Sequence, residues 1–170
     1  PAPAVPFGAC VAVVQATSYN RLLLRRQMRN LLDGLGGIQD LVRPGAHVVV
    51  KINLTGGIQA RPLPSVAPVD SYVTHPAVVG VLCEFLRDAG ASSITIVEAV
   101  YEWASYASWG YEDMVRPVAA QLIDLNSPDP YPDFIALSTG RGAVCYDSFT
   151  VNRVLAEADV FVSVAKMKCH

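Results

Sequence analysis

The chain has 170 residues, which fits one domain of ordinary size. Hydrophobic residues make up 52% and charged residues 16%, which excludes intrinsic disorder and a coiled coil. No apolar run reaches the roughly 18 residues of a spanning helix, so no transmembrane segment is expected. The net charge of −2 argues against nucleic acid as a partner. We therefore expect a single globular domain over residues 1–170.

The cysteines give no clue to a cofactor within the chain or to the compartment. None of them forms a Cys-x-x-Cys pair, so neither a zinc knuckle nor an iron–sulfur motif is present, and a disulfide scaffold is improbable at this density. The first six residues lack the pattern of a signal peptide. The sequence leaves open a cytoplasmic protein or one exported after removal of a leader. The four cysteines are Cys10, Cys83, Cys145 and Cys169.

The first half of the chain alternates strand-like and helix-like segments. Residues 9–15 are Val-rich and short, as in a buried parallel strand, and residues 19–35 carry leucines at helical spacing. Residues 47–52 predict a second strand. Residues 54–73, rich in Gly and Pro, predict a long loop, and such loops are usually functional or mobile. A helix over 76–89 is predicted, because Pro76 suits a first helical position.

The second half continues in the same order. The sequence predicts a strand over 93–97, an irregular aromatic-rich stretch, a short helix over 110–120 and a strand over 121–125. It then predicts a hairpin of 135–138 with 143–150, a short helix over 151–158, and a last, nearly all-apolar strand over 159–166 typical of a sheet centre.

Repeated strand–helix–strand order implies right-handed crossovers and a mainly parallel sheet. The predicted fold class is α/β: three layers, with a Rossmann-like, mainly parallel sheet covered by helices on both faces, plus a β-hairpin insertion.

In such folds ligands bind beyond the carboxyl ends of the strands. This rule selects polar residues at one edge of an otherwise apolar chain. It gives Lys51 and Asn53 after the second strand, Glu98 after the third, and Lys166, Lys168 and His170 after the last. The loop carrying Thr74 and His75 starts from the same edge. Cations, imidazoles and one carboxylate would suit a small anionic ligand, or a metal ion held by His and Glu.

Each of these residues also has a purely structural interpretation. Lys51 could extend from a strand end to solvent, and His75 could simply cap the following helix. Near the start of a helix an imidazole is kept neutral, which suits a metal ligand or a base. Glu98 is a candidate base or ligand, and the polar cluster after residue 165 could be frayed surface.

The order of the segments resembles a prokaryotic family known as domain of unknown function 362. The matching pieces are Val11-Ala12-Val13-Val14, Pro44-Gly45 with Val48-Val49-Val50-Lys51-Ile52-Asn53-Leu54, Thr74-His75-Pro76, Phe85-Leu86-Arg87-Asp88-Ala89-Gly90-Ala91, Trp109-Gly110-Tyr111, and Ala158-Asp159-Val160 running into Lys166-Met167-Lys168-Cys169-His170.

The resemblance implies that Lys51, Asn53, Thr74 and His75, with Lys166, Lys168 and His170, are the site. Its members often carry a ferredoxin-type module, so it implies an iron–sulfur cluster on a partner domain outside this chain. Two departures stand out. Cys169 replaces the usual Thr and offers, with His170, a soft metal ligand or a reactive thiol. Relatives also continue where this chain stops, so we expect it to be truncated at its C-terminal end.

Two functions from different classes follow. The first is an enzyme acting on a small anionic or carbonyl substrate: Lys51, Lys166 and Lys168 would hold negative charge, while His75 or Glu98 moves a proton. A looser similarity to the nickel-pincer lactate racemases belongs to this class. The second is a non-catalytic module that docks another domain, a partner or a second copy through an apolar surface. The enzyme requires these groups in one cleft, whereas the module would scatter them.

Overall fold

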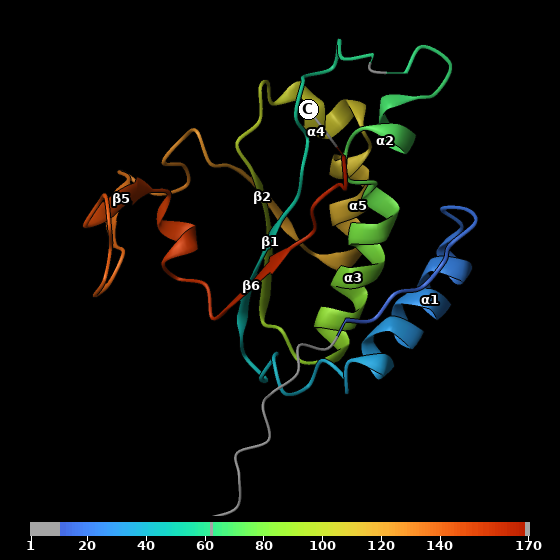
Figure 1. The fold of residues 1–170 in the computed structure, drawn as a ribbon, viewed down its shortest axis with the longest axis horizontal. Coiled ribbons are helices and arrows are strands. Elements are labelled where there is room, and N and C mark those ends of the chain that lie inside the picture. Colours follow the sequence, from blue (N-terminus) through green and yellow to red (C-terminus); the bar gives the residue numbers. More distant parts are fainter. Residues whose placement is uncertain (1–10, 62, 169–170) are drawn as a thin grey trace, which may run out of the picture.

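The computed structural model describes residues 11–61 and 63–168 (Figure 1). Its helices are α1 (Arg21–Gly34), α2 (Pro68–Ser71), α3 (Pro76–Asp88), α4 (Ala104–Ser108), α5 (Tyr111–Val118) and the 3₁₀ helix η1 (Arg153–Leu155). Its strands are β1 (His47–Lys51), β2 (Ser93–Glu98), β3 (Gln121–Asp124), β4 (Ile135–Ser138), β5 (Ser148–Val151) and β6 (Val160–Ser163).

Four parallel strands form the central sheet in the order β3-β2-β1-β6, and β4 and β5 pair as a separate antiparallel hairpin. The α/β class, the parallel sheet and the hairpin insertion are thereby confirmed. The two faces are covered unequally: α1, α3 and α5 lie on one side of the sheet, and η1 and the hairpin lie on the other (Figure 1).

Side-chain alternation along β1 explains the two cores. Val48 and Val50 point into the main cluster, which also contains Val79 and Leu86 of α3, whereas Val49 points to the opposite face. Each fully buried aliphatic side chain contributes about 1.5–3 kcal/mol. The larger cluster therefore fixes α3, and with it the loop that leads into α3, against the carboxyl half of the sheet. The smaller cluster, on the other face, consists of Val49, Val97, Ile123 and Val154.

The predicted strand over 9–15 is wrong over its described part, because residues 11–15 are not in a strand. Val11 and Val13 are 80% and 86% exposed, and the Gln27 side-chain amide donates to the Gln15 carbonyl at 2.8 Å. This end of the segment is thus held by α1 rather than by a neighbouring strand. Residues 9 and 10 lie outside the described residues.

The position or length of other predicted elements also differs from the structure. The last strand was predicted to be central, but β6 lies at the end of the sheet and its Phe161 is 54% exposed. The helix predicted over 151–158 is reduced to the three residues of η1, which Asn152 caps through its side chain. The loop over 54–73 holds the single turn of α2. None of the described helices is long and apolar enough to cross a membrane.

Candidate functional site: a lysine-rich edge of the sheet

The loop between β1 and α3 shapes one side of the site. Pro76 occupies the first turn of α3, and His75 is its N-cap. The imidazole Nδ1 of His75 accepts the Ala77 backbone N–H at 3.1 Å, so one of the otherwise unpaired amides at the helix start is satisfied. The capping predicted from the sequence is therefore present, and it fixes the direction in which the ring points.

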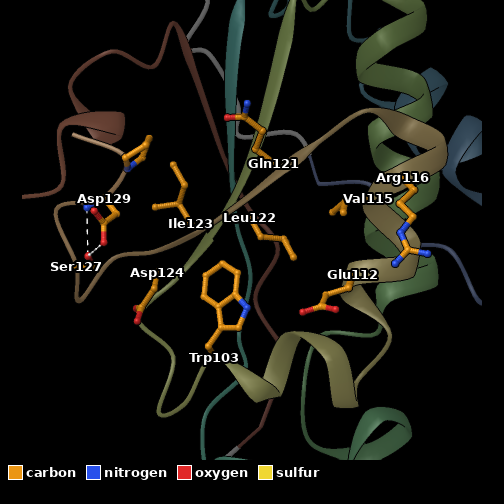
Figure 2. Close-up of a pocket in the computed structure, with 11 residues that line it drawn as sticks. Trp103, Glu112, Val115, Arg116, Gln121, Leu122, Ile123, Asp124, Ser127 and Asp129 are labelled. Atoms are coloured by element: carbon orange, nitrogen blue, oxygen red, sulfur yellow. Dashed lines mark hydrogen bonds between the residues drawn. The ribbon is translucent and has the colours of Figure 1, made fainter. Parts of the chain in front are cut away.

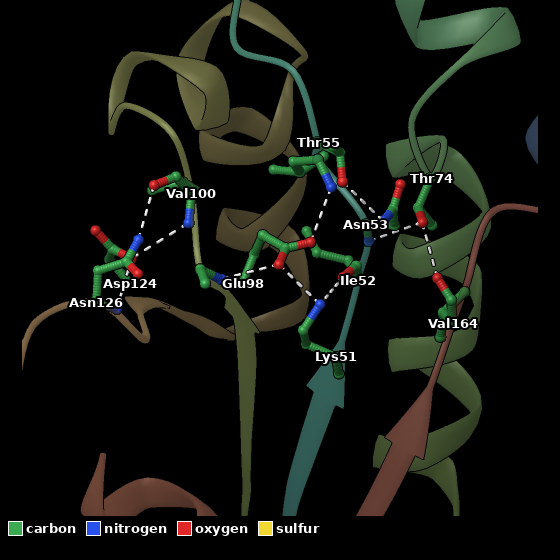
Figure 3. Close-up of polar contacts among 12 residues, drawn as sticks. Lys51, Ile52, Asn53, Thr55, Thr74, Glu98, Val100, Asp124, Asn126 and Val164 are labelled. Atoms are coloured by element: carbon green, nitrogen blue, oxygen red, sulfur yellow. Dashed lines mark hydrogen bonds and ion pairs between the residues drawn. The ribbon is translucent and has the colours of Figure 1, made fainter. Parts of the chain in front are cut away.

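Thr74 ties the ends of β1 and β6 together (Figure 3). Its hydroxyl donates to the Val164 carbonyl at 2.7 Å and accepts the Asn53 N–H at 3.0 Å. The Thr74 N–H in turn donates to the Asn53 carbonyl at 2.9 Å, and the buried Tyr111 hydroxyl donates to the Thr74 carbonyl at 2.8 Å. Thr74 itself is 4% exposed, so these bonds are shielded from water. Thr74 thus holds the ends of β1 and β6 together, and its hydroxyl and backbone hydrogens are both engaged within the protein.

Glu98, at the end of β2, is buried and fully engaged (Figure 3). Its Oε1 accepts from Lys51 Nζ at 2.8 Å and from the Ala99 N–H at 2.9 Å, while Oε2 accepts the Leu54 N–H at 2.9 Å. Lys51 Nζ also donates to the Ile52 carbonyl at 2.6 Å. With both oxygens occupied, Glu98 is better placed to hold the two strand ends in register than to move a proton.

The two remaining lysines approach the same edge from the segment after β6. Lys166 Nζ donates to the Asp70 carbonyl at 3.3 Å, and Lys168 Nζ donates to the Tyr72 carbonyl at 3.1 Å. Lys168 Nζ also lies 3.7 Å from the centre of the Tyr72 ring, in a cation–π contact. Within residues 11–61 and 63–168, neither ammonium group has a carboxylate partner in an ion pair. We call Lys51, Lys166 and Lys168, with His75, the lysine edge.

The lysines are close enough to affect one another. The pKa of Lys168 is lowered chiefly by burial; the nearby Lys166 charge lowers it further, and Glu98 opposes both effects. Lys51, Lys166 and Lys168 are the only lysines among the 170 residues, whereas ten arginines are distributed elsewhere. The fold therefore brings every lysine of the chain to one edge of the sheet.

His75 lies beside this group, stacked on Tyr19 with ring centroids 3.5 Å apart and planes 6° from parallel. Burial lowers its pKa; Asp70, whose Oδ1 is 3.7 Å from Nε2, raises it, and Lys166 lowers it. Because Nδ1 accepts a backbone N–H, the neutral ring carries its proton on Nε2. His75 is thus arranged as a neutral hydrogen-bond donor, and neither nitrogen presents a free lone pair to a metal.

The lowered pKa of His75 predicts a pH-dependent stability. Because the unfolded chain takes up this proton more readily than the folded one, stability contributed here is present above about pH 6.5 and is lost as the pH falls below it. We expect His75→Asn, which retains an N-cap side chain, to lose less stability than the wild type between pH 8 and pH 5.5. Urea unfolding at both pH values measures this difference. Equal losses in the two proteins would contradict it.

Asn53 carries an unsatisfied acceptor. Its Nδ2 donates to Thr55 Oγ1 at 3.1 Å, but its buried Oδ1 has no hydrogen-bond partner among the described residues. A buried acceptor without a donor costs about 1–3 kcal/mol.

The structure thus brings together Lys51, Glu98, Lys166, Lys168 and His75. Cys169 and His170, predicted as metal ligands, lie outside the described residues. No group of three or more His, Cys, Asp or Glu side chains that could hold a metal is found in the part of the chain that the structure describes.

Sequence reasoning missed Tyr19, Asp70 and Tyr72. Tyr19 precedes α1 and reaches His75 only through the packing of α1 on α3, which no local pattern reveals. Asp70 and Tyr72 lie in the segment predicted as loop, and their backbone carbonyls receive the lysines. The sequence indicated only that the loop over 54–73 is long, as functional loops often are.

Comparison with known proteins supports the family resemblance that the order of the segments indicated. The model of the family described as "Domain of unknown function (DUF362)" matches residues 48–170. The chain is 26% identical over 165 residues to the "Thylakoid-associated protein sll1697" of Synechocystis sp., an alignment that covers 94% of this chain and 45% of that protein. The chain thus spans less than half the length of this curated relative, and no solved structure matches it. Because the family model covers well over half of its residues, the chain belongs to the DUF362 family.

Proposed function

We propose that the lysine edge binds a small anion, a carboxylate or a phosphate. The observation that carries this proposal is that all three lysines of the chain gather at one edge of the sheet, while among the described residues only one of them is paired with a carboxylate. Placing like charges close together is unfavourable unless a counter-charge compensates. An anion between Lys166 and Lys168 would supply that charge.

The rest of the edge supports the same ligand class. The Glu98–Lys51 pair fixes the strand ends, so the site is organised before a ligand arrives. The Nε2–H of His75 offers one hydrogen-bond donor to such an anion.

Catalysis at this edge is the finer part of the proposal. An enzyme requires His75, Lys51 and the terminal lysines at one place, whereas a docking module has no need to gather them. Their proximity favours the first. We assign anion binding to Lys166 and Lys168, hydrogen-bond donation through Nε2–H to His75, and positioning to Glu98. A metal ion held by Cys169 and His170, and an iron–sulfur cluster on a partner domain outside this chain, both stay predictions from the sequence.

The proposal is tested by calorimetric titration with inorganic phosphate and with malate. Lys168→Gln is expected to weaken binding of the better ligand by about 10- to 100-fold, because a hydrogen bond to a charged group contributes about 1.5–3 kcal/mol. Arg26→Gln, on the exposed side of α1, makes the same charge change away from the site and should leave affinity within about twofold. Equal weakening by both variants, or no binding by the wild type, would refute the proposal.

A further inference from the structure

A cavity of about 720 Å³ lies along the free edge of β3, away from the lysine edge (Figure 2). Leu122 points to the side of α5 and Val115, and Ile123 points to the side of the loop carrying Ser127 and Asp129. The cavity is therefore a groove that follows the edge strand and is lined by residues from both faces of the sheet. Its lining is Trp103, Glu112, Val115, Arg116, Gln121, Leu122, Ile123, Asp124, Ser127, Asp129 and Pro130.

Among the described residues no strand pairs with β3 on the side away from β2, so the backbone there is available for pairing. The Leu125 N–H donates to the Glu98 carbonyl of β2 at 2.9 Å. Because the pairing direction alternates along a parallel strand, Ile123 and Gln121 also face β2, and Leu122 presents its N–H and carbonyl outward. Natural edge strands are usually blocked by lysine, proline or a bulge. Gln121–Asp124 contains neither lysine nor proline.

The lining of the groove includes an exposed aromatic side chain and, around its opening, several carboxylates, which we call the acidic rim. Trp103 is 51% exposed and is held edge-on against Tyr106, with ring centroids 5.1 Å apart. The rim carries the carboxylates of Glu112, Asp124 and Asp129. Its one cation, Arg116, already pairs with Asp113 at 3.1 Å, so it does not offset these charges.

We propose that this groove binds an extended, basic segment of a partner protein, which adds to the sheet as a strand beside β3. Strand addition gains affinity from main-chain hydrogen bonds and specificity from alternate side chains. Apolar side chains of the segment would contact the exposed Trp103, and its Lys or Arg side chains would meet the acidic rim. A second copy of this chain is disfavoured, because pairing β3 with itself brings two acidic rims together.

The test uses an eight-residue peptide of alternating valine and lysine, a matched valine–glutamate peptide, and the full chain. The first peptide is expected to bind and to shift the tryptophan fluorescence of the protein to shorter wavelength. This shift should be absent in the Trp103→Phe variant. The valine–glutamate peptide is expected to bind at least about tenfold more weakly. The proposal is overturned if the two peptides bind equally well, or if the valine–lysine peptide does not bind at a concentration of about 1 mM, where a binding free energy of about −4 kcal/mol would give half-saturation.

Variants separate strand pairing from simple apolar contact. Leu122→Pro removes the outward N–H, which an edge strand tolerates, and should weaken binding about tenfold or more. Leu122→Ala keeps that N–H and should stay within about threefold. Should Leu122→Pro not fold, the double variant Glu112→Gln/Asp129→Asn gives the decisive comparison against Asp33→Asn on α1. Unchanged affinity in the double variant contradicts the proposal, as does self-association that depends on Glu112 and Asp129.

Discussion

Replacing Glu98 by glutamine is expected to lower the free energy of unfolding by about 3 kcal/mol at pH 7. The carboxylate accepts one ammonium and two backbone N–H groups while only 6% exposed. Glutamine has a single acceptor oxygen and turns an N–H₂ toward existing donors. Removing one member of a buried pair costs about 3–5 kcal/mol, and the 30% exposure of the Lys51 side chain places this pair at the low end.

Urea unfolding of Glu98→Gln, Lys51→Met and the double variant measures this effect. The double variant should lose less than the sum of the two single losses, since neither partner is then left unpaired. A loss below about 1 kcal/mol in Glu98→Gln would mean that the carboxylate does not hold the strand ends and would leave it free for catalysis.

Replacing Thr74 by valine is expected to cost about 2–4 kcal/mol. The two side chains have nearly the same shape, but valine leaves the Asn53 N–H and the Val164 carbonyl without their partner. Each unsatisfied buried group costs about 1–3 kcal/mol. Because the same hydroxyl joins β1 to β6, amide hydrogen exchange should speed up at Asn53.

Thr74→Ser is the matched control, since it keeps the hydroxyl and loses only a methyl group. It should remain within about 1 kcal/mol of the wild type. If valine and serine are equally tolerated, the hydroxyl bridge is not what joins the strand ends.

The placement of the three lysines could be predicted because a single topological rule applies to it. Once residues 47–52 and 159–166 are recognised as parallel strands, Lys51, Lys166 and Lys168 must lie at or just after their carboxyl ends. The cap at His75 could also be predicted, since Pro76 indicates where the helix begins. Local patterns are sufficient for both.

What could not be predicted depends on contacts between distant segments. Residues 11–15 have the composition of a strand, but a strand needs a partner edge, and the Gln15 carbonyl is instead bonded to Gln27 of α1. The position of β6 at the end of the sheet depends in the same way on which strands surround it. The contacts of Glu98 with Leu54 and Ala99 favour a positioning role for this predicted base, and composition does not reveal these contacts.

The most direct test of anion binding at the lysine edge is an NMR titration with the lysines labelled at ¹³Cε. The chain has only three lysines, so three signals are expected, and substitution assigns each of them. We predict that one of them, Lys168, titrates below the ordinary lysine pKa of 10.5, and that inorganic phosphate or malate raises its pKa and shifts the Lys166 signal. Three lysines that titrate alike, unchanged by either anion, would contradict the account.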